Sequence, residues 1–167
     1  ESNYHMAFQA LISKAGIPPG NIHRMPAEIH PPEAAARRYA QDLRDFFVMV
    51  EERGMNHARP GQIGSTPSFD LILLGMGEDG HTASLFPGQQ HPAEQLTHAV
   101  HNAPKPPPDR VSLSARALSE ARAVLVLVTG EGKRAAVQGW RSGKQLPIAA
   151  IGGAATIDVL LDKAAQA

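Results

Sequence analysis

Cysteine is absent from the 167-residue chain, which excludes a disulfide framework, a thiolate nucleophile and any zinc site built on cysteine. Net charge is also lacking, because 16 Lys and Arg balance 16 Asp and Glu, and nucleic acids require a basic surface. The longest apolar run, residues 71–74 extended by Phe69, is far shorter than the ~20 residues that span a bilayer. No signal peptide is visible at Glu1. We therefore predict a soluble, cytoplasmic protein that binds neither nucleic acid nor membranes.

Aromatic residues are scarce at 5%, whereas 15 Gly and 14 Pro indicate many short loops between aliphatic elements. In the first third of the chain we predict two helices. The first is capped by Ser2 or Asn3 and ends before Gly16. The second covers residues 33–53, with Gly54 as its stop. Residues 54–68 are predicted to be a loop.

Apolar strands dominate the rest of the prediction. Residues 69–74 and 123–129 have almost no polar face, which is typical of buried parallel strands. A further strand is expected at 110–114, and helices are expected at 117–122, 131–141 and 156–165. The His- and Pro-rich segment 89–109 is interpreted as an excursion. The order predicts an α/β fold with a mostly parallel, Rossmann-like sheet and helices on both faces.

A glycine-rich turn follows the first strand, and Gly75, Gly77 and Gly80 satisfy the pattern G-x-G-x-x-G. A dinucleotide site is nevertheless disfavoured, because Glu78 and Asp79 would place two carboxylates where a pyrophosphate should bind. We therefore expect no nicotinamide or flavin cofactor. The turn still marks the carboxyl end of a parallel strand, where α/β folds place their sites.

His81 and Asp79 are the candidate chemical groups of this turn. We expect His81 at the start of a short helix over 82–85, whose positive end keeps the imidazole neutral and available as a base. Asp79 is close enough to orient the ring. From this pair alone an alternative stays open, in which Asp79 only caps the helix and His81 only packs.

The segment FDLILLGMGEDGHTASLFPG, residues 69–88, resembles the signature of the 6-phosphogluconolactonase family. Residues 1–4, 18–24, 110–114 and 128–133 resemble it too. The resemblance implies the fold of the sugar-phosphate isomerases and deaminases. It also implies hydrolysis of 6-phospho-D-glucono-1,5-lactone to 6-phospho-D-gluconate in the pentose phosphate pathway, with His81 as the base.

Members of this family carry a glycine-rich phosphate loop and an Asp-Glu-Arg segment before the Ser-Asn pair that stands here as Ser2-Asn3, and this sequence contains neither. Residues 1–167 are accordingly expected to form a single domain that corresponds to the C-terminal two-thirds of the family domain. The sequence does not indicate an oligomeric state.

The substrate of such an enzyme needs cations for its phosphate and donors for its oxyanion. Arg110 and Lys133 lie near predicted strand ends, and the related sugar-phosphate enzymes place phosphate ligands at matching positions. Backbone N–H groups around Gly75, Gly77 and Gly80 are candidates for the oxyanion. We expect no metal, and we interpret the nearby histidines as solvated surface residues: His91, His98 and His101.

Two other functions stay open at this point. A glucosamine-6-phosphate deaminase shares the fold and the histidine, but that family follows its Gly-His with Ile-Ala-Phe-Asn-Glu-Pro, where this chain has residues 82–87 as TASLFP. A non-catalytic sugar-phosphate sensor on the same fold is the second, and the adjacent His81 and Asp79 argue against it.

Overall fold

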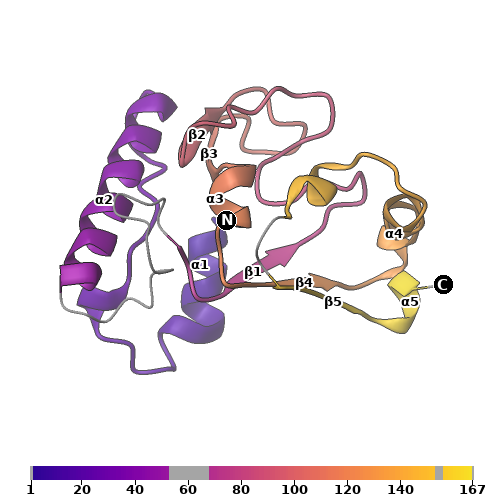
Figure 1. Cartoon of the computed structure of the whole chain (residues 1–167), viewed down its shortest axis with the longest axis horizontal. Coiled ribbons are helices and arrows are strands. Elements are labelled where there is room, and N and C mark those ends of the chain that lie inside the picture. Colours follow the sequence, from indigo (N-terminus) through magenta and orange to yellow (C-terminus); the bar gives the residue numbers. More distant parts are fainter. Residues whose placement is uncertain (1, 53–67, 153–155, 167) are drawn as a thin grey trace.

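A parallel three-stranded sheet forms the centre of the computed structural model, which describes residues 2–52, 68–152 and 156–166. Its strands are β1 (Ile72–Gly75), β4 (Ala123–Val128) and β5 (Thr156–Leu161), in the order β1-β4-β5. Figure 1 shows them side by side in the lower middle of the view. Because parallel strands run in one direction, the loops that follow β1 and β4 leave the sheet at the same edge.

A second, antiparallel sheet pairs β2 (Thr97–Val100) with β3 (Arg110–Leu113). The long helix α2 (Pro32–Glu52) packs along this pair, away from the parallel sheet in Figure 1. The hydroxyl of Thr97 donates to the carbonyl of Ala36 at 2.6 Å, which ties the sheet to the helix. The strand predicted at 110–114 is therefore confirmed, but it pairs outside the parallel sheet.

The core lies against one face of the parallel sheet. Alternate residues of β1 and β4 point into it, as the period of two requires. Side chains from α3 (Ala115–Ser119), α4 (Arg134–Arg141) and the turn η4 (Pro147–Ala150) cover that face. The buried members include Ile72, Leu74, Val124, Val126, Val128, Leu118, Val137 and Ile148.

The remaining elements are short. At the N-terminal end α1 (Asn3–Ala7) continues into the π-helical turn η1 (Phe8–Ile12), and the Ser2 hydroxyl caps it by accepting the His5 N–H at 3.1 Å. Two single turns, η2 (Pro19–Asn21) and η3 (Glu131–Lys133), and the helix α5 (Lys163–Gln166) complete the set. Among the described residues, none of the helices is both long enough and apolar enough to cross a bilayer.

The α/β fold with a parallel sheet is confirmed, and so are the helices predicted at 33–53 and 131–141, within a residue or two at the described ends. The helix predicted at 156–165 is wrong, because residues 156–161 form β5. Those six residues pair with β4 along its whole length, and this tertiary pairing overrides the local pattern that predicted a helix. The predicted loop at 54–68 lies outside the described residues except for Ser68.

The excursion predicted at 89–109 also needs correction, since residues 97–100 form β2. This strand is only four residues long and contains a histidine, so its sequence lacked the apolar run that predicted the other strands.

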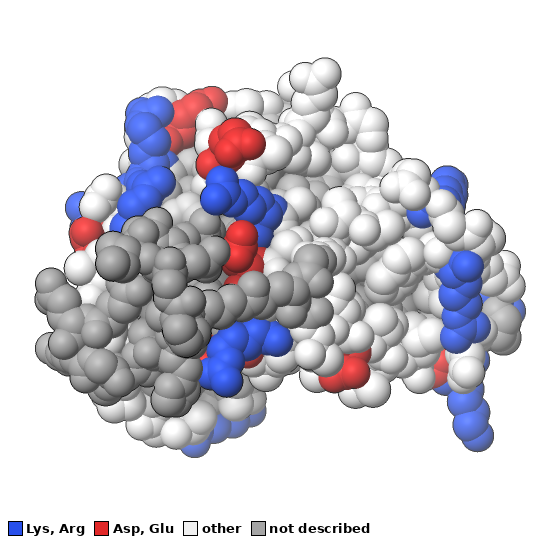
Figure 2. All heavy atoms as spheres, viewed as in Figure 1, with Lys and Arg blue, Asp and Glu red and all other residues white. Residues whose placement is uncertain are grey.

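The second face of the parallel sheet carries large apolar side chains that the described residues leave exposed. The exposed fractions are 54% for Leu71, 59% for Leu73, 46% for Leu127 and 56% for Leu160. A contiguous apolar surface such as these leucines form favours association. The charged side chains do not oppose this with a patch of one sign, since Figure 2 shows basic and acidic side chains interspersed on the face in view.

We predict that the 167-residue chain self-associates through this sheet face. Leu73→Lys combined with Leu127→Lys should shift the chain toward monomer in sedimentation velocity, because both side chains are exposed and their removal costs no core packing. The matched control is Val126→Lys on the opposite face, which is 1% exposed and should unfold the chain. Unchanged association in the double variant would contradict the prediction.

Candidate active site

The loop that leaves β1 folds back on itself through main-chain hydrogen bonds. The N–H of Gly77 donates to the carbonyl of His81 at 2.8 Å, and the N–H of Gly80 donates to the carbonyl of Gly77 at 3.0 Å. The N–H of Ile148 then donates to Gly80 at 3.2 Å, which joins the loop to η4. The loop is therefore a closed turn with a fixed shape.

Two of its glycines are required by that shape. A Cβ on Gly77 would lie 2.0 Å from Nδ1 of His81 and 2.7 Å from Oδ1 of Asp79. Gly80 has a φ of +82°, and a Cβ there would meet Leu146 at 2.7 Å. Gly75 is under no such constraint, because its nearest neighbour would be the carbonyl of Leu127 at 4.0 Å. Gly77 thus leaves the space in which the carboxylate and the imidazole meet, and Gly80 allows the turn to pack against Leu146.

Asp79 and His81 are in direct contact. Oδ1 of Asp79 lies 2.6 Å from Nδ1 of His81 and also accepts the backbone N–H of His81 at 3.1 Å. Burial by itself would raise the pKa of Asp79, but the two hydrogen bonds from His81 outweigh it and lower that pKa below its ordinary value. Because Asp79 is ionised at neutral pH, His81 donates from Nδ1 and its Nε2 keeps a lone pair.

The short helix predicted at 82–85 is wrong. Thr82 and Leu85 instead close a tight turn, and the hydroxyl of Thr82 donates to the carbonyl of Gly75 at 2.9 Å. Ala83 has a φ of +49°, which no right-handed helix accommodates. Residues 82–85 therefore present no helix N-terminus to His81, and Asp79 has no helix there to cap.

Phe86 connects the candidate site residues, and the sequence analysis missed it. Its ring is 2% exposed and lies 4.8 Å from the ring of His81, centre to centre. The guanidinium of Arg110 lies over the same ring at 5.4 Å. Phe86 is within the family signature, but no spacing in the sequence indicates that its ring contacts residues from two separate segments.

Arg110, at the start of β3, thus shares the ring of Phe86 with His81. Its Nε donates to the carbonyl of Pro107 at 3.0 Å, and its Nη2 donates to Lys105 at 2.7 Å and to Pro106 at 3.0 Å. Nη1 has no hydrogen bond to a described residue. Arg110 therefore shapes the proline-rich turn and still has a donor available.

Lys133 lies in η3, directly after β4. Gly132 next to it is packed against the side chain of Glu78, since a Cβ on Gly132 would meet Oε1 of Glu78 at 2.9 Å. The loops after β1 and β4 therefore touch, as expected for neighbouring parallel strands. Lys133 is half-buried and belongs to the second of these loops.

The histidines predicted to be solvated require a correction. His98 is 2% exposed and His91 is half-buried, and their rings are 3.0 Å apart at Nδ1 of His91 and Nε2 of His98. His101 is exposed, as predicted, but it bridges Glu33 at 2.7 Å and Asp109 at 2.8 Å. Hydrogen bonding to Glu33 and then to Asp109 raises the pKa of His101 above its ordinary value.

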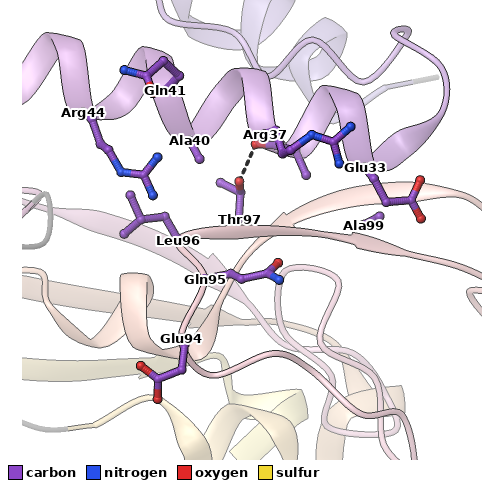
Figure 3. Close-up of a pocket in the computed structure, with 11 residues that line it drawn as sticks. Glu33, Arg37, Ala40, Gln41, Arg44, Glu94, Gln95, Leu96, Thr97 and Ala99 are labelled. Carbon is purple, nitrogen blue, oxygen red and sulfur yellow. Dashed lines mark hydrogen bonds between the residues drawn. The ribbon is translucent and has the colours of Figure 1, made fainter.

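A separate groove of about 510 Å³ runs between α2 and β2. Figure 3 shows Arg37 and Arg44 on its helical wall and Leu96 and Thr97 on the opposite side. None of its lining residues belongs to the His81 loop. Because no histidine is among its lining residues, the His81 loop is the better candidate active site.

Comparison with known proteins agrees with the motif and its geometry. Residues 1–160 match the family of glucosamine-6-phosphate isomerases and 6-phosphogluconolactonases. This chain belongs to that family. It is 42% identical to the 6-phosphogluconolactonase of Streptomyces coelicolor over 99% of this chain and 62% of that protein. It is 39% identical to the human 6-phosphogluconolactonase over 83% of this chain and 48% of that protein.

Solved structures of the glucosamine-6-phosphate isomerase and 6-phosphogluconolactonase family have the same fold. The 6-phosphogluconolactonase of Thermotoga maritima superposes with a TM-score of 0.76 at 28% identity, covering 96% of this chain and 65% of that one. The chain thus spans about half to two thirds of the length of the relatives that it matches.

We predict that Gly77→Ala separates the Asp79 carboxylate from the His81 ring. The new methyl group cannot fit 2.0 Å from Nδ1, so the downfield Nδ1 proton of His81 should disappear from the NMR spectrum, with a loss of about 1–3 kcal/mol in the free energy of unfolding. Gly75→Ala is the control, and it should leave the signal in place. A retained signal in Gly77→Ala would show that the turn does not enforce the contact.

Proposed function

We propose that this protein hydrolyses 6-phospho-D-glucono-1,5-lactone to 6-phospho-D-gluconate, with His81 as the general base. The observation that carries the proposal is the 2.6 Å contact between Asp79 and Nδ1 of His81, which leaves Nε2 as a proton acceptor. The names of the relatives at 42% and 39% identity support the choice of substrate. The pentose phosphate pathway in the cytoplasm is the corresponding setting.

In the proposed reaction His81 takes a proton from water through Nε2. The water oxygen bonds to the lactone carbonyl carbon, and the carbonyl oxygen becomes an oxyanion. When the bond from this carbon to the ring oxygen breaks, the imidazolium returns its proton to that oxygen. Asp79 stabilises the imidazolium and fixes the tautomer throughout. Both tasks match a carboxylate whose pKa is already lowered by His81.

The oxyanion needs N–H groups that are not already used in the fold. In the turn from Gly75 to His81, the N–H groups of Gly77, Gly80 and His81 bond within the loop. The N–H group of Glu78 forms no bond to another described residue, whereas the N–H of Asp79 interacts with the carboxylate of Asp79 itself. We assign the oxyanion to this part of the turn, with the glycines keeping the main chain accessible.

The phosphate is assigned to Arg110 and Lys133. Arg110 retains a free donor at Nη1 and is positioned by Phe86 relative to His81. Lys133 lies in the loop that touches the His81 turn through Gly132 and Glu78. Charge-assisted hydrogen bonds of this type contribute roughly 1.5–3 kcal/mol each. We further propose that residues 1–167 act as one domain.

We predict that His81→Asn lowers kcat by at least ~10²-fold in the full-length protein, the usual cost of losing a general base. Asp79→Asn should cost less, since it removes the orienting group and not the base. Binding of a non-hydrolysable substrate analogue, measured by calorimetry, should change little. Near-full turnover in His81→Asn would overturn the catalytic assignment. Release of ammonia from glucosamine 6-phosphate would instead indicate a deaminase.

We predict that Arg110→Ala or Lys133→Ala weakens kcat/KM for the phosphorylated lactone by roughly 1.5–3 kcal/mol. Hydrolysis of unphosphorylated gluconolactone should hardly change, because that substrate has no phosphate to lose. Arg110→Lys, which keeps a cation but not the fork of donors, is the matched comparison. Equal losses on both substrates would mean that Arg110 acts through the proline-rich turn and not through the phosphate.

A further inference from the structure

A pair of histidines, His98 and the half-buried His91, lies next to Phe86. His98 on β2 is 2% exposed, and its Nε2 lies 3.0 Å from Nδ1 of His91. The other ring nitrogen of His91, Nε2, lies 3.0 Å from the backbone nitrogen of Phe86. An unbroken series of hydrogen bonds therefore runs from β2 to Phe86.

The direction of each bond in this series follows from Phe86, because a backbone N–H can only donate. Nε2 of His91 therefore accepts, and neutral His91 has its proton on Nδ1. That proton is donated to Nε2 of His98, so neutral His98 also has its proton on Nδ1. The carbonyl of Phe86 lies 3.4 Å from Nε2 of His91, but a proton there would face the closer Phe86 N–H.

The second ring nitrogen of His98, Nδ1, is buried and contributes no hydrogen bond to another described residue. Burial, and then the nearby His91, lower the pKa of His98 to about 4, so the ring is neutral near pH 7. A buried polar atom without a partner requires an explanation. The hydrogen bond from His91 explains why a histidine stands at position 98, since an aliphatic side chain there could not accept the Nδ1 proton of His91.

Phe86 is the point at which this series reaches the candidate active site. Its buried ring contacts the ring of His81 and the guanidinium of Arg110. We propose that His98 and His91 are positioning residues, which hold Phe86 through directed hydrogen bonds and thereby set the orientation of His81 and Arg110. The effect on catalysis rests on the proposed function, whereas the proton positions and the hold on Phe86 do not.

The proton positions are tested by ¹⁵N NMR of the imidazoles in the wild-type chain at neutral pH. We expect the Nδ1–H form for both His91 and His98, although free histidine favours Nε2–H. The exposed His5 on α1 is the internal reference. An Nε2–H form at His91 would overturn the proposal, because Phe86 would then have no acceptor there.

The hold on Phe86 is tested by amide hydrogen exchange. His91→Leu removes the acceptor, and the Phe86 amide should exchange faster by at least about tenfold. His91→Gln offers a carbonyl oxygen in its place and should keep exchange within about twofold of wild type. His5→Leu is the control for a histidine replaced elsewhere. Equal protection in His91→Leu would contradict the proposal.

The catalytic consequence is tested by kinetics on the full-length protein. His98→Leu and His91→Leu should each lower kcat by about tenfold through misplacement of His81, with KM nearly unchanged and His91→Gln restoring most of the rate. His98→Leu should change Tm little, because it removes an unpartnered buried nitrogen together with a single hydrogen bond to His91. The double variant should be no slower than His91→Leu.

Equal kcat in all variants would overturn the positioning role. A wild-type protein without lactonase activity, but with these proton positions and exchange rates, would contradict the proposed function alone.

Discussion

The contact between Asp79 and His81 is the interaction on which the candidate site depends. It joins two residues of one turn at 2.6 Å, and it exists because Gly77 leaves the space that any side chain would fill. Burial opposes the charge on Asp79, and the two hydrogen bonds from His81 more than offset that penalty. The shape of the backbone thus keeps the pKa of Asp79 low and the two side chains in contact.

Everything else in the site is arranged around that turn by contacts between distant segments. Phe86 packs on His81 and receives Arg110 from β3, while Glu78 packs on Gly132 beside Lys133. Parallel pairing of β1 with β4 brings Glu78 and Gly132 together, because the loops that follow these two strands leave the sheet at the same end. The contact between Phe86 and Arg110 depends instead on the antiparallel sheet, because Arg110 begins β3 and lies against the proline-rich turn.

The parallel sheet is uneven in its two faces. One face is packed by α3, α4 and η4, and the other exposes leucines of all three strands or their flanks within the described residues. The chain also spans only part of the length of its relatives. The match over residues 1–160 shows the family. The activity of the whole protein is proposed from the chemistry of the candidate site, which lies where the loops after β1 and β4 touch.

The class of fold, the two apolar strands, the long helix and the candidate pair of Asp79 and His81 can all be predicted from the amino-acid sequence. These follow from local patterns: continuous apolar runs, helical spacing over residues 33–53, and a turn whose glycines bracket Asp79 and His81. The family signature added the proposed reaction, since that signature lies within one continuous segment. Local information suffices wherever the partners are near in sequence.

The remaining features depend on strand pairing, burial and loop shape, which arise in the folded chain. Residues 156–161 became a strand because β4 offered them an unpaired edge, although their sequence was equally suitable for a helix. Residues 82–85 became a tight turn because Thr82 bonds back to Gly75. His98, predicted on the surface for its polar neighbours, is buried because β2 pairs with β3 and packs on α2. Strand pairing and burial are properties of the whole chain, and no single segment encodes them.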